Sequence, residues 1–303
     1  MINKKNLIFE TLFWGKINPD KVTIKKTPGL LKRSARAEKF IENEWKKQIS
    51  SGLKTRPNDI RPSRYHFGGL KIAKKFIEIS AEPIISYQDV IGSRPDKFRK
   101  LFKKESWPTP VSADMVLIAK NKKGEEMLGI TLRNADQDYK AGGFHITTGG
   151  AMEIGKDKKP IDAALRETEE ECGIKSKELS NVSCRGIIFN PYQSEIGIIF
   201  VATANIPTEK ILSRRHDNEN NTLFIPLKKE ILEYWLLELT HANSTDGIVG
   251  ALTVGSDIYG KKWAENILAK IMKKSAGYGN AKKEKVLEKR DIRKLKSFLK
   301  SKS

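Results

Sequence analysis

The chain has 303 residues, of which 38% are hydrophobic and 31% charged, and its formal net charge is +20. This length suits one large domain or two small ones, and no apolar run is long enough to cross a membrane. The apolar stretch near the N-terminus is broken by Glu10 and Thr11 and lacks a small-residue cleavage site, so we expect a cytoplasmic protein without a signal peptide. Two cysteines, Cys172 and Cys184, fit a reducing compartment and argue against a zinc site.

The positive charge is concentrated at the two ends of the chain. Residues 1–106 carry a net charge of +14 and residues 273–303 one of +9, whereas residues 107–272 carry −3. Basic surfaces attract nucleic acids, nucleotides and acidic lipids, although charge runs of this kind are often only solvated surface. The charge pattern therefore predicts three parts: a basic N-terminal module, a near-neutral central domain and a basic tail that is helical or disordered.

The N-terminal module, residues 1–106, shows the signals of one longer helix and two strands. Apolar residues recur at helical spacing over 34–49, and β-favouring residues cover 65–72 and 76–87. A short basic helix is expected over 95–104. Four aromatic residues of this module are able to stack on a base, but core packing is the commoner use of such side chains: Trp14, Trp45, Tyr65 and Phe67.

The central part, residues 107–272, alternates strand and helix signals. Strands are expected over 113–119, 126–132, 142–148, 184–189 and 196–204, and helices over 230–239 and 260–272. The segment 244–256 is rich in glycine and threonine, and we expect it to line the substrate side. This order predicts an α/β fold.

Residues 149–174, GGAMEIGKDKKPIDAALRETEEECGI, carry the strongest chemical signal in the sequence. Read as a helix, Glu167, Glu170 and Glu171 stand at i, i+3 and i+4 and share one face. Such close like charges repel, and a divalent cation such as Mg²⁺ or Mn²⁺ compensates them, because it prefers carboxylate oxygens. A solvated acidic face is the alternative for three glutamates alone.

The opposite face of this helix is apolar, and the flanking residues define its ends. Pro160 suits the first turn, Asp157 is expected to help cap it, and Gly173 followed by Ile174 predicts a left-handed stop. Five residues at helical spacing form the predicted buried stripe: Ile161, Ala164, Leu165, Thr168 and Cys172.

The run Arg166-Glu167-Thr168-Glu169-Glu170-Glu171-Cys172-Gly173-Ile174, preceded by Gly149-Gly150 and Glu153, resembles the signature of the Nudix hydrolases. Thr168 occupies an apolar position of that pattern, and Thr148 stands where family members commonly have proline. The interval from Gly150 to Arg166 is two residues longer than the pattern. The first glutamate has no clean match, because Asp157 or Lys158 falls there.

The resemblance implies specific roles for these residues. Glu167, Glu170 and Glu171, with the carbonyl of Gly149, match the metal ligands, and Arg166 would hold the glutamates in place. We call the matching segment, residues 149–174, the box. Some family members take the catalytic base from a loop that follows the box, which makes Glu195 the candidate base outside it. Nudix enzymes commonly form homodimers. The implied fold is an α/β/α sandwich with a mixed sheet, here with an N-terminal β-containing module and a C-terminal helix with a basic tail.

The implied function is the metal-dependent hydrolysis of a nucleoside diphosphate linked to another group X, such as a nucleotide sugar or ADP-ribose. Two alternatives stay open. The basic ends favour an enzyme directed at the 5′ end of RNA. The altered first half of the box favours a Nudix-fold nucleotide- or RNA-binding or regulatory protein without turnover, which the intact glutamates argue against.

Overall fold

The computed structural model describes residues 9–27, 31, 33–53, 59–133, 143–191, 193–214, 220–240, 243–275 and 295. The basic tail beyond residue 275, apart from residue 295, lies outside the described residues, so the expectation for it stays a prediction. Among the described residues, no helix is long and apolar enough to span a membrane.

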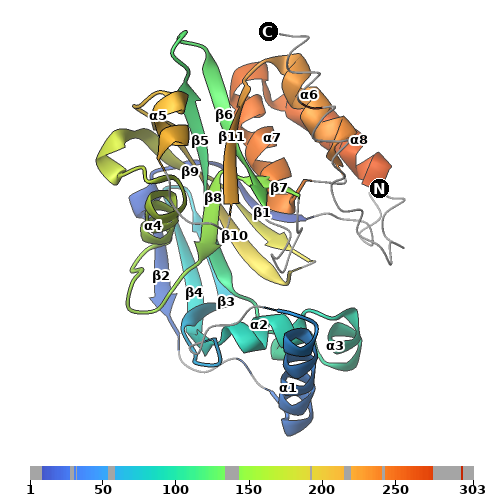
Figure 1. Ribbon diagram of the computed structural model, residues 1–303. Helices are drawn as coiled ribbons and strands as arrows, with labels where there is room; N and C mark the ends of the chain where they lie inside the picture. Colours follow the sequence, from blue (N-terminus) through green and yellow to red (C-terminus); the bar gives the residue numbers. More distant parts are fainter. Residues whose placement is uncertain are drawn as a thin grey trace.

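A large mixed sheet forms the centre of the molecule (Figure 1). Its main order is β1-β9-β10-β5-β6-β11, with β7 paired to β6 and β8 paired to β5. Strands β10 and β5 run parallel, and the other pairs are antiparallel. The strands are β1 (Glu10–Ile17), β5 (Val111–Lys120), β6 (Glu126–Arg133), β7 (Phe144–Ile146), β8 (Thr148–Ala151), β9 (Leu179–Asn190), β10 (Glu195–Ala204) and β11 (Asn220–Pro226).

Helices cover both faces of this sheet. One face carries α6 (Lys229–Glu238), α7 (Thr245–Tyr259) and α8 (Lys261–Ser275), and the other carries α4 (Pro160–Cys172) (Figure 1). Alternate residues of β5 therefore enter different cores: Val116 packs with the α6–α8 layer, and Met115 with the α4 layer. The predicted α/β/α sandwich with a mixed sheet is confirmed. A short helix, α5 (Thr208–Ser213), follows β10.

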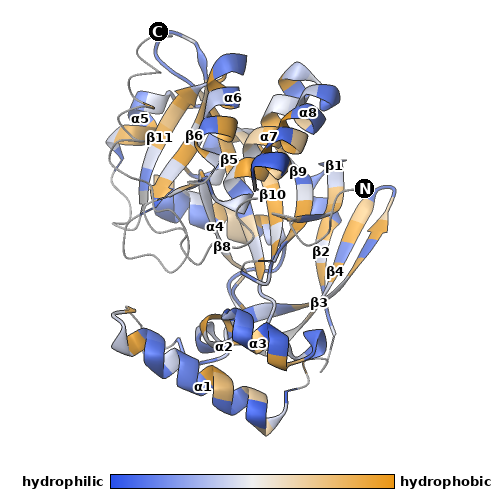
Figure 2. Cartoon of the chain, turned by 90° about the vertical axis from the view of Figure 1, so that its right-hand side faces the viewer, coloured by the Kyte–Doolittle hydropathy of each residue, from blue (hydrophilic) through white to orange (hydrophobic). Residues whose placement is uncertain are grey.

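A second, three-stranded sheet has the order β2-β4-β3 and comes entirely from the N-terminal part. Its strands are β2 (Val22–Lys26), β3 (Arg64–Ala73) and β4 (Phe76–Ile85). Three helices, α1 (Ala35–Ser50), α2 (Tyr87–Ser93) and α3 (Asp96–Leu101), lie beyond the end of this sheet. Figure 2 shows α1 largely in the hydrophilic colour. Its apolar side packs Ile41 with Phe98 of α3 in a small core of their own.

The N-terminal residues are built into the rest of the fold at two places. Strand β1 pairs with β9 and so forms one edge strand of the large sheet. Val22 and Ile77 of the small sheet belong to the same buried cluster as Met115 of the large one. The division between residues 106 and 107 stays a prediction, but part of the expected module lies within the large sheet.

The structure also contains elements that the sequence reasoning did not predict, namely β1, β2, α2 and α5, and it divides the strand predicted over 142–148 into β7 and β8. The predicted strands over 65–72, 113–119, 126–132, 184–189 and 196–204 and the helices over 34–49, 230–239 and 260–272 are present, and α8 buries Trp263, Ile267 and Ile271 as expected. Most of residues 244–256 form the buried helix α7, which the sequence reasoning did not predict, and the expectation that this segment lines the substrate side stays a prediction. The side chain of Ser244 caps α7, because its hydroxyl oxygen accepts a hydrogen bond from the amide of Gly247 at 3.0 Å.

Candidate functional site

Helix α4 positions the acidic residues, and its two ends are set by its own sequence. Pro160 occupies its first turn, and the carboxylate of Asp162 accepts from the amides of Lys158 and Lys159 at 2.9 and 2.8 Å. Gly173 ends the helix with a φ of 59°, as predicted. The expectation that Asp157 caps the helix was wrong, because the nearer Asp162 satisfies these amides and Asp157 is engaged elsewhere.

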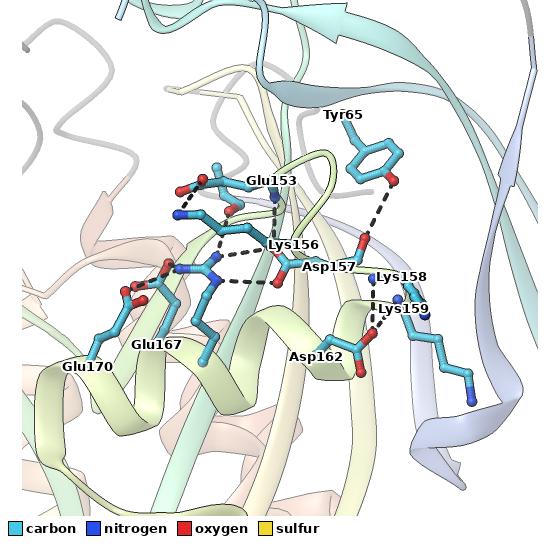
Figure 3. A network of polar contacts seen from close by, with 11 residues as sticks. Tyr65, Glu153, Lys156, Asp157, Lys158, Lys159, Asp162, Glu167 and Glu170 are labelled. Atoms are coloured by element: carbon cyan, nitrogen blue, oxygen red, sulfur yellow. Dashed lines mark hydrogen bonds and ion pairs between the residues drawn. The ribbon is translucent and has the colours of Figure 1, made fainter. Parts of the chain in front are cut away.

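The guanidinium group of Arg166 joins the loop between β8 and α4, here called the box loop, to the acidic helix face. Figure 3 shows Asp157 of this loop and Glu167 and Glu170 of the helix. Its Nε and Nη2 donate to the two carboxylate oxygens of Asp157 at 3.2 and 3.1 Å. Its Nη1 donates to Glu167 at 2.6 Å and to Glu170 at 3.2 Å, and Nη2 also reaches the carbonyl of Ala151 at 3.3 Å. Arg166 thus contacts two of the three glutamates, the arrangement expected of a residue that holds them in place.

Of the two residues that fall at the first glutamate of the pattern, Asp157 contacts Arg166 and Lys158 does not. Its side chain is 2% exposed, pairs with Arg166 and also accepts from the amide of Glu153 at 2.7 Å. Lys158 is exposed and contributes only a backbone amide to Asp162. A carboxylate from this loop therefore pairs with the arginine of α4.

The glutamates of the box differ strongly in their surroundings. The side chain of Glu167 is 15% exposed, and burial raises its pKa although the Arg166 charge opposes the shift. A Cβ at Gly150 would lie only 2.3 Å from Oε1 of Glu167, so the glycine makes room for this carboxylate. Glu170 is 54% exposed. Glu171 is partly buried, and its charge acts on a further acid, Asp114.

Asp114 is a buried carboxyl that the sequence reasoning missed. It stands on β5, is 3% exposed, and its Oδ2 has no hydrogen-bond partner among the described residues. Glycines make space on both sides: a Cβ at Gly149 would lie 1.9 Å from its Oδ1, and one at Gly197 would lie 3.3 Å from its Oδ2. Burial, together with the charges of Asp246, Glu195, Glu171 and Glu167, raises its pKa well above the ordinary value.

Asp246 is the second acid that the sequence reasoning missed. It lies in the first turn of α7, is 6% exposed, and its Oδ2 is 3.5 Å from Nε2 of His145. Its Oδ1 faces the same point beside Gly197 as Asp114 does. The signal for Asp114 was an aspartate within an otherwise apolar strand. No comparable signal marked Asp246, because the segment that carries it did not read as a helix.

Glu195, the base candidate outside the box, begins β10. Its charge raises the pKa of Asp114 and opposes the lowering of the Arg64 pKa. The neighbouring Pro191 carbonyl accepts from Nη1 of Arg99 on α3. The N-terminal helices thus contact the loop that leads into Glu195.

The residues of the box fit a divalent cation in kind. They offer carboxylate oxygens and a backbone carbonyl, which hard cations prefer, and Asp114 adds a buried oxygen without a hydrogen-bond partner among the described residues. In the part of the chain that the structure describes, no three His, Cys, Asp or Glu side chains form a ready metal-binding group. The oxygens of Glu167 and Glu170 instead face Arg166.

Among the comparisons with known proteins, only the one with solved structures finds proteins that are similar to this chain. No family model matches the chain, and no curated protein does. A Nudix hydrolase from Alicyclobacillus acidocaldarius is 15% identical with a TM-score of 0.37, over 48% of this chain and 91% of that one. The Nudix hydrolase RenU from M. smegmatis is 13% identical with a TM-score of 0.34, over 50% and 86%. The NUDIX domain of Shewanella oneidensis NrtR, solved with ADP ribose, is 11% identical with a TM-score of 0.34, over 53% and 92%.

Proposed function

We propose that the chain is a divalent-metal-dependent Nudix pyrophosphohydrolase that cleaves the diphosphate of a nucleoside diphosphate linked to a group X, of the nucleotide-sugar or ADP-ribose type. The observation that carries this proposal is the contact of Arg166 with Glu167 and Glu170 on one face of α4, next to Gly150. The alternative is that the acidic helix face is only solvated surface. That alternative explains neither the buried Arg166–Asp157 pair nor the glycine that makes room for Glu167.

Each residue of the box has a proposed role. Glu167, Glu170 and Glu171, with the carbonyl of Gly149, would hold Mg²⁺ or Mn²⁺. When bound, such an ion neutralises charge on the diphosphate and lowers the pKa of a coordinated water. Arg166 fixes the glutamate side chains through its fork of donors, and Asp157 in turn fixes Arg166.

The proposed reaction is the hydrolysis of the phosphoanhydride. The oxygen of a water forms a bond to one phosphorus, and the bond from that phosphorus to the bridging oxygen breaks. The bridging oxygen leaves with the other phosphate, and a carboxylate takes the proton of the water. Glu195 is the proposed base outside the box, because it begins β10, which pairs with the strand that carries Asp114, and its charge raises the pKa of Asp114. A glutamate of α4 is the other candidate for this role.

A panel assay with a matched pair of variants tests the function. Product release is measured from nucleotide sugars, ADP-ribose, dinucleoside polyphosphates, nucleoside triphosphates and 5′-triphosphate RNA, with Mg²⁺ or Mn²⁺. We expect metal-dependent turnover of a nucleoside diphosphate compound that Glu171→Gln abolishes. Glu169→Gln is the control, because Glu169 is an exposed residue of the same helix outside the proposed ligand set.

Two outcomes would contradict the proposal. Silence across the panel from folded protein would favour a binding or regulatory protein, and turnover restricted to the RNA would favour the RNA-directed enzyme. Mn²⁺ binding, followed by electron paramagnetic resonance, gives a readout that does not depend on turnover. We expect Glu171→Gln to weaken it and Glu169→Gln to leave it unchanged.

A further inference from the structure

Arg64 stands where the small N-terminal sheet meets the box loop. It is the first residue of β3 and forms an isolated antiparallel bridge with Glu153. On either side of it, the carbonyl of Ser63 accepts from the amide of Ile154 at 2.8 Å, and the amide of Tyr65 donates to the carbonyl of Met152 at 3.4 Å. The backbone of Arg64 is thus fixed against the loop that leads into α4.

The side chain of Arg64 is held by stacking. Its guanidinium carbon lies 4.5 Å from the centre of the Tyr87 ring. Its Nη1 is buried and has no hydrogen-bond partner among the described residues. Burial lowers the pKa of the guanidinium, and the Tyr87 phenol and the carboxylates of Asp59, Glu153 and Glu195 oppose that shift. The group therefore remains a cation in a partly desolvated place.

The nearby carboxylates do not neutralise Arg64 by direct contact. Glu153 forms its ion pair with Lys156, at 2.8 Å, and no ion pair joins Arg64 to any of the residues that the structure describes. A guanidinium that loses hydration without gaining hydrogen bonds costs free energy, and stacking on one ring offsets only part of that cost. An incoming anion would supply the missing acceptors. Arg64 as a whole is only partly buried.

We propose that Arg64 binds the non-bridging oxygens of the substrate diphosphate, so that the N-terminal sheet supplies a cation to the candidate site. This inference rests on the proposed function, which makes the substrate a diphosphate. Arginine suits the role because its planar fork matches phosphate oxygens in pairs. The backbone of Arg64 is bridged to Glu153 in the loop that leads into α4, the helix that carries the glutamates. The diphosphate would then be held by both the cation and the box.

Binding of inorganic pyrophosphate to the full chain without divalent metal tests this proposal independently of turnover. Titration calorimetry in the presence of EDTA should show binding to the wild type that Arg64→Gln weakens about 10- to 100-fold, the loss expected for charged hydrogen bonds. Arg64→Lys, which keeps the charge but loses the fork, should fall between them. Arg36→Gln removes an exposed charge from α1 and should bind like the wild type.

Thermal unfolding separates a binding role from a structural one. Because Nη1 of Arg64 is buried without a hydrogen-bond partner among the described residues, Arg64→Gln and Arg64→Met should have a Tm equal to or above that of the wild type. The proposal is overturned if Arg64→Gln binds pyrophosphate like the wild type, if the wild type does not bind it, or if both variants lose stability. Absence of turnover with intact pyrophosphate binding would instead count against the proposed function alone.

Discussion

The hydroxyl groups of Thr148 and Thr168 lie 2.9 Å apart, and both side chains are fully buried. Thr148 directly precedes the glycine pair Gly149-Gly150 on β8, at a position where Nudix proteins commonly have proline. Thr168 stands on α4 at an apolar position of the family pattern. Oγ1 of Thr168 also donates to the carbonyl of Ala164 at 2.6 Å, so Thr148 is the donor between the two threonines. Two departures from the pattern are thus in contact and satisfy each other.

The direction of these hydrogen bonds predicts unequal costs for the two valine variants. Thr168→Val leaves the Thr148 hydroxyl buried without an acceptor and should lower the free energy of unfolding by about 1–3 kcal/mol. Thr148→Val leaves Thr168 bonded to Ala164 and should cost only about 0.5–1 kcal/mol. Urea unfolding of each variant measures the difference. The double variant should cost less than both single changes added together, and strict additivity would mean that the contact contributes nothing.

Arg166 is expected to contribute to stability as well as to the site. Arg166→Met leaves the carboxylate of Asp157, which is 2% exposed, without its partner. Breaking a buried ion pair in this way should cost about 3–5 kcal/mol, measured by urea unfolding. Arg166→Lys keeps the charge and should lose less. A methionine variant as stable as the wild type would show that the pair does not hold the box loop.

Gly150 is expected to matter for activity far more than for stability. A Cβ at this position would lie 2.3 Å from Oε1 of Glu167, whose carboxylate Arg166 already holds. Gly150→Ala should displace that carboxylate and reduce kcat by about 100-fold, the cost of misplacing a catalytic group by a small distance. Gly186→Ala is the control, because its Cβ would meet only an ordinary contact at 3.5 Å. Equal activity of the two variants would remove Glu167 from the site.

Local patterns predicted the α/β class and the helix of residues 160–172 because these features are set by residues close in sequence, whereas the sandwich was implied by the resemblance to the Nudix signature. Pro160 and Gly173 fix the ends of α4, and the spacing of Ile161, Ala164 and Cys172 fixes its buried face. Alternation and turn signals placed the central strands in the same way. These features need no knowledge of which strands become neighbours.

The acids outside the box depend on contacts between distant segments. Asp114 and Asp246 approach only because Gly149 and Gly197, from two strands that flank β5, leave space. Helix α7 was missed because its glycines favour loops. In the fold they permit close packing, since a Cβ at Gly255 would lie 2.1 Å from the Trp263 ring. The approach of Arg64 to Glu153 likewise depends on pairing that no local pattern encodes.

The end of the box helix should confer a defined acid dependence on stability. Arg214 donates to both carboxylate oxygens of Glu178 at 2.7 and 2.8 Å and to the carbonyl of Gly173 at 2.6 Å. The hydrogen bond from Arg214, with one from the Lys175 amide, lowers the pKa of Glu178 from 4.5 to about 2. A carboxyl whose pKa is lowered on folding stabilises the fold at every pH above the pKa of the unfolded chain. This contribution is lost as the pH falls toward the folded pKa of about 2.

Unfolding of the wild type and of Arg214→Gln across acid pH measures this contribution. We expect the difference in the free energy of unfolding to stay constant above about pH 5, and to shrink as the pH falls through 4.5 toward the folded pKa of about 2. The residual difference at low pH reports the bond to Gly173, which does not titrate. Arg214→Lys should show a weaker pH dependence, because lysine lacks the paired donors. A difference that does not vary with pH would mean that Glu178 and Arg214 do not interact in solution.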